Sequence, residues 1–154
     1  MYAGLLRDLR SLVGGVDESA AAVLANAAAL IYERTGYFWV GFYMVDDGVL
    51  KLAPFQGPVA CYRIGFGKGV CGTAWQRAQT LVVPDVEEFP GHIACSSLSR
   101  SEIVVPMFDD DKNVIGVLDI DSREPDAFDS SDKESLEQAC AIIAATLSRC
   151  PYRA

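Results

Sequence analysis

Residues 37–52 have the sequence YFWVGFYMVDDGVLKL, and this stretch decides the fold class. Two runs rich in aromatic and branched apolar residues flank an acidic turn, Asp-Asp-Gly, at positions 46–48. Turns of this kind join adjacent antiparallel strands, so the stretch predicts a β-hairpin. The same pattern recurs farther along, where residues 102–108 and 114–121 flank a polar turn at 109–113. The sequence therefore predicts two hairpins.

Helices are predicted on both sides of the hairpins. A short helix is expected over residues 3–13, and a longer one from Asp17, as its N-cap, to Arg34, with Gly36 as the stop signal. The last helix is expected over residues 131–148, since it opens with the capping-box sequence Ser-Asp-Lys-Glu and continues with an apolar stripe.

The middle of the chain, residues 54–101, is rich in Gly, Pro, Ser and Cys. It contains one short helical stretch after Val70 and one short strand at Thr80 to Val83. Loops this long inside a compact domain usually carry function. The whole pattern predicts a single α+β domain over residues 1–154, with the N- and C-terminal helices packed on one face of a central antiparallel sheet.

Composition excludes several classes of protein. Of the 154 residues, 51% are hydrophobic and 22% are charged, which is typical of a globular domain and not of a disordered chain. The formal net charge of −8 argues against nucleic acid or an anionic membrane as a partner. The sequence shows neither an apolar run long enough to span a bilayer nor the pattern of a secretory signal. We therefore expect a cytoplasmic protein.

The chain has five cysteines, an odd number that argues against a disulfide framework. Cys140 lies on the apolar stripe of the last helix and is expected to be inert, and Cys150 is expected to be an incidental terminal thiol. Cys61, Cys71 and Cys95 lie in the loop-rich middle and are candidates for reactive thiols, although simple packing is the alternative. Cys71 is placed where a helix begins, a position that lowers a thiol pKa.

Two other interpretations of this region are disfavoured. The four possible zinc ligands are Cys61, Cys71, His92 and Cys95. Structural zinc sites usually pair their ligands at close spacing, and the deaminase motifs are missing. Residues 67–72, GKGVCG, match the dinucleotide pattern G-x-G-x-x-G with Asp85 beyond, but the helix that follows is too short for a parallel crossover. No metal or organic cofactor is therefore expected.

The second hairpin carries three acidic residues that are expected to converge. Asp119 and Asp121 are two positions apart and share one face of their strand, and the turn places Glu102 roughly opposite them. One interpretation is a solvated strand end; the other is a pocket for an ammonium group with raised carboxyl pKa values. Trp39 and Tyr43 share a face of the first hairpin, either as core or as the wall of a ligand pocket.

Five ordered stretches resemble the free methionine-(R)-sulfoxide reductase family, whose members use a GAF domain. The stretches are FQGPVAC at 55–61, GVCGTAW at 69–75, VPDV at 83–86 with FPGHIAC at 89–95, SEIVVP at 101–106, and GVLDIDS at 116–122. The resemblance extends from about residue 17 to residue 147. It implies a single GAF domain.

The resemblance also implies roles for individual residues. Cys95 matches the nucleophile that becomes a sulfenic acid, Cys61 matches the cysteine that resolves it to a disulfide, and Cys71 matches a third cysteine whose role differs between members. The residues that match positions of the substrate pocket are Trp39, Tyr43, Glu102, Asp119 and Asp121.

The implied substrate is free L-methionine (R)-sulfoxide, and the implied reductant is thioredoxin. The terminal helices are the surface that we expect a homodimer to use. The alternative function is a GAF sensor that binds a small molecule without chemistry.

Overall fold

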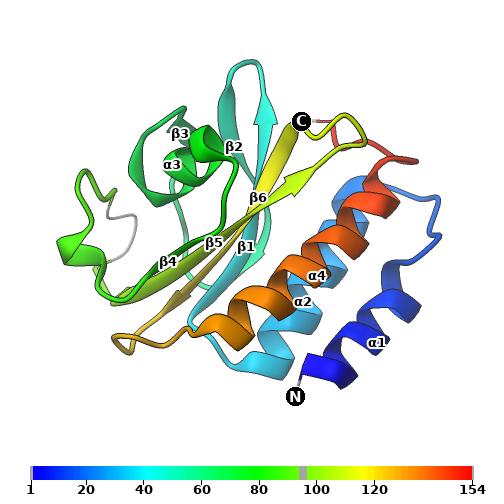
Figure 1. Cartoon of the computed structure of the whole chain (residues 1–154). Helices are drawn as coiled ribbons and strands as arrows, with labels where there is room; N and C mark the ends of the chain where they lie inside the picture. Colours follow the sequence, from blue (N-terminus) through cyan, green and yellow to red (C-terminus); the bar gives the residue numbers. More distant parts are fainter. Residues whose placement is uncertain (1, 94–96, 154) are drawn as a thin grey trace.

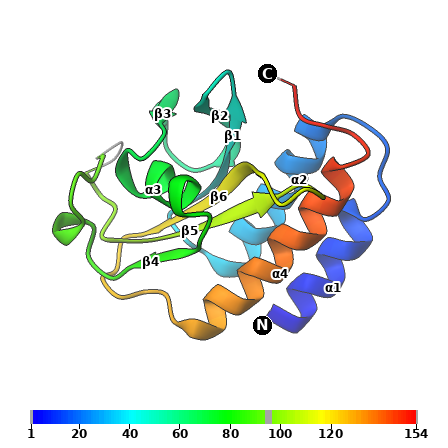
Figure 2. The ribbon, with the colours of Figure 1, turned by 45° about the horizontal axis from the view of Figure 1, so that its top comes forward.

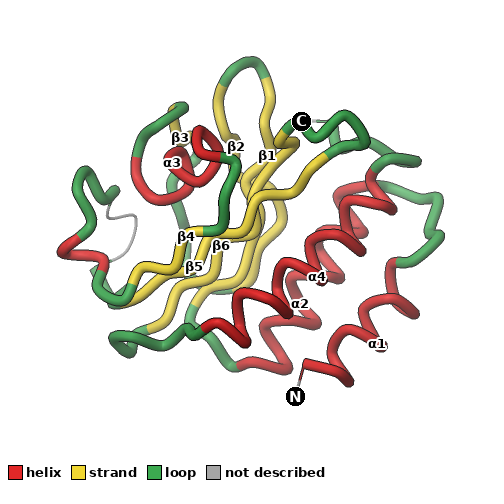
Figure 3. Tube along the Cα trace, in the orientation of Figure 1, coloured by secondary structure: helices red, strands yellow, loops and turns green. Residues whose placement is uncertain are grey.

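The computed structural model of the chain describes residues 2–93 and 97–153. Its helices are α1 (Tyr2–Val13), α2 (Ala20–Thr35), α3 (Gly69–Arg77) and α4 (Ser130–Leu147), with a 3₁₀ turn η1 (Val86–Glu88). Its strands are β1 (Trp39–Asp46), β2 (Val49–Gln56), β3 (Arg63–Gly65), β4 (Leu81–Val83), β5 (Ser101–Phe108) and β6 (Val114–Ser122). Together these described strands form one sheet in the order β3-β2-β1-β6-β5-β4, drawn in yellow in Figure 3.

Every neighbouring pair of strands is antiparallel, so the predicted α+β class is confirmed. Both predicted hairpins form, β1 with β2 and β5 with β6. The first turns through Asp47 and Gly48, which have φ angles of 52° and 77° and so adopt the left-handed conformation that this tight turn requires. The short helix and strand predicted in the middle of the chain are α3 and β4.

The helices divide into two groups about the sheet. Helices α2 and α4 cover one face, and α1 packs against both of them from outside (Figures 1 and 2). The terminal helices thus lie on one face, as predicted. Helix α3 lies on the opposite face, against β3, β5 and β6. Across the described ranges no helix is both long and apolar enough to cross a membrane.

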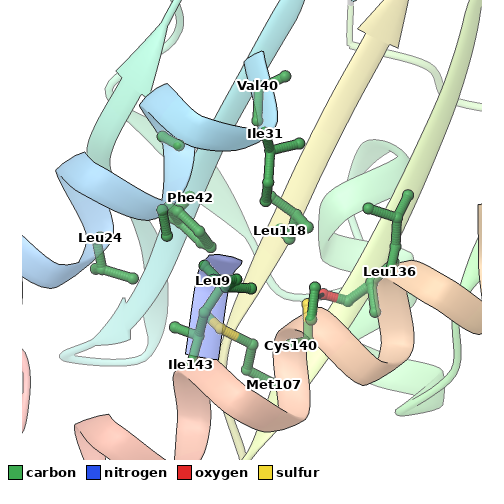
Figure 4. Close-up of a cluster of buried hydrophobic side chains, with 14 of the residues drawn as sticks. Leu9, Leu24, Ile31, Val40, Phe42, Met107, Leu118, Leu136, Cys140 and Ile143 are labelled. Carbon is green, nitrogen blue, oxygen red and sulfur yellow. Dashed lines mark hydrogen bonds between the residues drawn. The ribbon is translucent and has the colours of Figure 1, made fainter. Parts of the chain in front are cut away.

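The main hydrophobic core lies between the sheet and the helices α1, α2 and α4. Figure 4 shows Phe42, Leu118 and Ile143 in this cluster, and all three are completely buried. Cys140 is 2% exposed and belongs to the same cluster, which confirms that it is part of the apolar stripe of α4. Because side chains alternate along a strand, the neighbours of these core residues point to the opposite face, toward α3.

The N-caps predicted for two helices were each wrong by two positions. Helix α2 is capped by Ser19 instead of Asp17, with the Ser19 hydroxyl accepting from the Ala22 N–H at 3.4 Å. Helix α4 is capped by Asp129 instead of Ser131, through a capping box with Asp132. In both helices a nearby side chain of equal capping ability competes with the predicted one. Asp132 also accepts a 2.6 Å hydrogen bond from the Tyr2 hydroxyl, which ties α1 to α4 and favours this register.

Candidate functional site

A cavity lies on the α3 face of the sheet, between α3, the central strands and the segments that follow β2 and η1. Three carboxylic acids line it, together with Cys71, His92, Ser99 and a set of apolar and aromatic residues. The apolar part of the lining comprises Phe38, Trp39, Tyr43, Val59, Ala60, Ile64, Gly69, Val70 and Ile93. None of the described residues that line it is a lysine or an arginine. The cavity therefore presents acidic groups without a matching cationic side chain.

The three acids are the ones that the sequence predicted to converge. Glu102 pairs with Asp121 across β5 and β6, and Asp119 lies two residues away on the same face. Glu102 is 5% exposed and Asp119 is 6% exposed, so the interpretation as a solvated strand end was wrong. Burial, followed by repulsion from Asp119, raises the pKa of Glu102 and of Asp121 well above their usual values. Burial also raises the pKa of Asp119.

One acceptor atom in this cluster stands out. Within the described part of the chain, Asp119 Oδ1 is buried and has no hydrogen-bond partner. A buried acceptor without a partner is rare and costly. His92 is the nearest basic group, with Nε2 at 3.8 Å from Glu102 Oε1. Burial lowers the pKa of His92, whereas the charge of Asp119 acts in the opposite direction, and His92 in turn lowers the pKa of Asp119.

Cys71 was predicted to have a lowered pKa, and that prediction was wrong. The thiol does lie in the first turn of α3, but it is 3% exposed and faces the acidic cluster. Burial raises the pKa of Cys71 well above its usual value, and the charges of Asp119, Glu102 and Asp121 raise it further. The effect of the helix N-terminus is outweighed by desolvation and three nearby carboxylates.

The aromatic wall of the cavity is built on β1 and β2. Trp39 stacks on Tyr43, with ring centroids 6.1 Å apart, and on Phe55, with centroids 5.2 Å apart. The Trp39 indole N–H donates to the carbonyl of Pro58 at 3.0 Å, which fixes the ring. The predicted common face of Trp39 and Tyr43 is therefore confirmed, and this face lines the cavity and not the main core.

Tyr43 also links this wall to a cysteine. Its hydroxyl donates to the carbonyl oxygen of Cys61 at 2.9 Å, so the segment after β2 is held beside the cavity. Cys61 is half-buried and disulfide-bonded, whereas Cys71, Cys140 and Cys150 are free. Cys95, the predicted nucleophile, lies outside the described residues.

Sequence reasoning missed several residues that line or support the cavity. Phe55 was noted only within a motif, although its ring stacks on Trp39. His92 was considered only as a zinc ligand, whereas it lies beside Glu102. Phe38 lines the cavity and carries Arg123 over its ring, with Cζ 4.6 Å from the centroid. The sequence feature that could have pointed to Phe38 is the aromatic run at the start of β1. This run alone does not show on which face of the sheet each ring lies.

Gly41 provides the space that Trp39 occupies, which gives a first prediction. A Cβ atom at Gly41 would lie 2.6 Å from Trp39 Cη2 and would also meet Phe55 Cβ. We expect Gly41→Ala to displace both rings, lower the free energy of unfolding by roughly 1–3 kcal/mol and weaken ligand binding in the cavity. Denaturant unfolding and ligand titration measure the two effects.

Gly4→Ala is the matched control for this prediction. A Cβ atom at Gly4, in α1, meets only Arg7 Nη2 at 3.7 Å, so this change is expected to be neutral or slightly stabilising. Equal stability and ligand affinity in the two variants would contradict the role assigned to Gly41.

Comparisons with known proteins identify the family. The family model of the GAF domain matches residues 19–147. The free methionine-R-sulfoxide reductase of Escherichia coli is 46% identical over 153 residues, which cover 99% of this chain and 92% of that protein. GAF domain-containing protein A of Dictyostelium discoideum is 53% identical over 143 residues, covering 92% of this chain and 89% of that protein.

Solved structures give the same result. The free methionine-R-sulfoxide reductase of Neisseria meningitidis, solved in complex with its substrate, has a TM-score of 0.92 at 51% identity and covers 96% of this chain and 90% of that chain. The reduced form of the Staphylococcus aureus enzyme fRMsr has a TM-score of 0.90 at 48% identity, covering 95% of this chain and 94% of that chain. The fold, the acidic pocket and these relatives together show that the chain belongs to the GAF-domain family of free methionine-R-sulfoxide reductases.

Proposed function

We propose that this protein reduces free L-methionine (R)-sulfoxide to methionine through thiol chemistry at Cys95. The observation that carries the proposal is the cluster of buried Glu102 and Asp119 with partly buried Asp121, in a cavity with an aromatic wall. The ammonium group of a free amino acid compensates part of the acidic charge, and the Trp39 ring contacts its methylthio end. A peptide-bound methionine sulfoxide has no such ammonium group, so it leaves the acidic charge of the cavity uncompensated.

The reaction balances as an oxygen transfer from substrate sulfur to enzyme sulfur. The Cys95 thiolate attacks the sulfoxide sulfur and forms an S–S bond, while a protonated carboxyl group among Glu102, Asp119 and Asp121 donates its proton to the sulfoxide oxygen; the raised pKa values of these groups favour the protonated form. The resulting hydroxyl group moves to the Cys95 sulfur as the S–S bond and the bond between oxygen and the methionine sulfur break, so methionine leaves and Cys95 becomes a sulfenic acid.

The Cys61 thiol then attacks the Cys95 sulfenic acid, which releases water and leaves a disulfide. The disulfide-bonded state of Cys61, with Cys71, Cys140 and Cys150 free, supports this role. A dithiol protein, thioredoxin in this proposal, restores both thiols by exchange. We propose that the cycle runs in the cytoplasm, where free thiols are maintained.

The direct test measures methionine released from each sulfoxide epimer with dithiothreitol as the reductant. We expect the free R epimer to be consumed and the free S epimer to be reduced far more slowly, since the related enzymes are named for the R epimer. N-acetylmethionine (R)-sulfoxide has no ammonium group and should be reduced at least about 100-fold more slowly than the free R epimer, because an unpaired buried charge costs several kcal/mol.

Thiol titration separates an enzyme from a sensor. In the absence of reductant, an enzyme loses about two thiols per chain when methionine sulfoxide is added, whereas a sensor loses none. Equal rates for the free and N-acetylated substrates would contradict the assignment of the acidic cluster to the ammonium group.

A further inference from the structure

We propose that Cys71, Glu102 and Asp119 form an inhibitory site for one thiophilic divalent cation, of which Zn²⁺ is the natural candidate. The cation binds in the cavity and excludes the amino-acid substrate. The metal site stands on the structure by itself, whereas the competition with substrate rests on the proposed function.

The geometry of the three side chains suits a single ion. Cys71 Sγ and one carboxylate oxygen each from Glu102 and Asp119 all lie within 4.8 Å of one another, and all three residues are buried. Zinc binds sulfur at about 2.3 Å and oxygen at about 2.0–2.2 Å, so the ligand atoms of a tetrahedral site lie roughly 3.3–3.7 Å apart. The three side chains therefore need to close in by about 1 Å at most around the ion.

A second observation points to a missing positive group. Asp119 belongs to this cluster, is 6% exposed, and has in Oδ1 an acceptor without a hydrogen-bond partner among the described residues. No lysine or arginine is among the described residues that line the cavity. A cation at this point supplies the partner that the Oδ1 atom of Asp119 lacks and compensates the repulsion between Asp119 and Glu102.

The donor set determines which cation binds. A thiolate with carboxylates suits zinc and its analogue cobalt, whereas Mg²⁺ and Ca²⁺ prefer oxygen ligands alone. His92 lies beside this group, with its Nε2 3.8 Å from Glu102 Oε1, but it is not one of the three residues whose ligand atoms all lie within 4.8 Å of one another. Metal binding displaces the proton of Cys71, as it does at other thiol sites.

The consequence is inhibition without oxidation of any cysteine. The cation takes the place of the substrate ammonium group and holds the carboxyl groups that serve the reaction as proton donors. The enzyme is then inactive until a chelator or a competing thiol removes the metal. Such a site makes the reductase sensitive to the concentration of free zinc.

The test uses Co²⁺ as the spectroscopic probe, on protein whose Cys61 disulfide is intact. In this state the Cys61 sulfur is not available as a thiolate ligand. We expect one Co²⁺ to bind per chain and to give a thiolate-to-cobalt charge-transfer band. Zn²⁺ should displace the Co²⁺, whereas Mg²⁺ at the same concentration should not.

Matched variants identify the ligands. Cys71→Ser is expected to abolish the charge-transfer band and to weaken Co²⁺ binding at least about 10-fold, whereas Cys140→Ser, in the main core, leaves both unchanged. Glu102→Gln should weaken binding but keep the band, since Cys71 remains. Far-UV circular dichroism confirms that each variant is folded.

Two outcomes separate this inference from the proposed function. A missing thiolate band in the disulfide form, or a band that persists in Cys71→Ser, overturns the metal site even if the protein reduces methionine sulfoxide. If the two ligands compete, the apparent dissociation constant of Co²⁺ should rise linearly with the concentration of free methionine. If Co²⁺ binds through Cys71 but methionine has no effect, the cavity is not the amino-acid site, and the competition is overturned.

Discussion

Replacing Cys95 by serine is expected to lower the rate of methionine formation by at least about 10³-fold, in single as well as multiple turnover. A serine hydroxyl stays protonated at neutral pH and is a far weaker nucleophile toward sulfur than a thiolate. Quantitation of free methionine after rapid mixing of enzyme with excess methionine (R)-sulfoxide measures the effect. The prediction tests the role that the sequence resemblance implies for Cys95.

Cys61→Ser is the informative partner of this variant. It retains the nucleophile, so we expect about one methionine per chain in a rapid first turnover, followed by a stall when thioredoxin is the reductant. Cys140→Ser should behave like the natural protein, because this thiol is buried in the main core. Multiple turnover at the full rate by Cys95→Ser would show that another residue attacks the sulfoxide.

The parts of the fold that were predictable are those fixed by short-range patterns. The position of Glu102 roughly opposite residues 119–121 followed from the turn, because the turn sets the register of a hairpin; the exact partner, Asp121, depends on a register shift between Met107 and Phe108 that the pattern does not show. Helix starts were less predictable. Asp129 and Ser131 are both good caps, and the contact of Asp132 with Tyr2, 130 residues away, is not visible in a local pattern.

The properties of Cys71 show where local reasoning ends. Its place in the first turn of α3 was correct, but the pKa of its thiol depends on Glu102 and Asp119, which come from distant strands. The same holds for the Trp39–Phe55 stack, since it requires the register of β1 on β2 and the space left by Gly41. Sequence patterns thus indicated which residues converge, whereas burial and charge compensation required the three-dimensional structure.

Glu102→Gln is expected to have the second largest effect on activity, a loss of about 10²–10⁴-fold in kcat/KM. The glutamine amide keeps the shape of the side chain and can still donate a hydrogen bond, but it has no acidic proton to transfer. In the proposed mechanism the protonated cluster is the active form, so the natural enzyme should lose activity as the pH rises through the raised pKa values. The three acids titrate together, so the loss of activity at high pH reports the titration of the whole cluster and not of one residue.

The same substitution is expected to stabilise the protein at neutral and alkaline pH. The pKa of Glu102 is raised in the folded state, so between the usual value of about 4.3 and the raised value the folded chain binds more protons than the unfolded chain. The free energy of unfolding of the natural protein therefore falls as the pH rises through this window. Glu102→Gln removes this loss, so the variant should be more stable than the natural protein at pH 8 and should lose this advantage as the pH falls to the usual value of a glutamate.

Denaturant unfolding at several pH values measures this gain, and Glu33→Gln, on the exposed side of α2, is the matched control that should change neither stability nor activity. An acid that costs stability and yet serves the reaction gives opposite changes in the two measurements. A variant that is inactive and also less stable at pH 8 would instead show that Glu102 is needed for packing, and would remove its assignment as part of the proton-donating cluster.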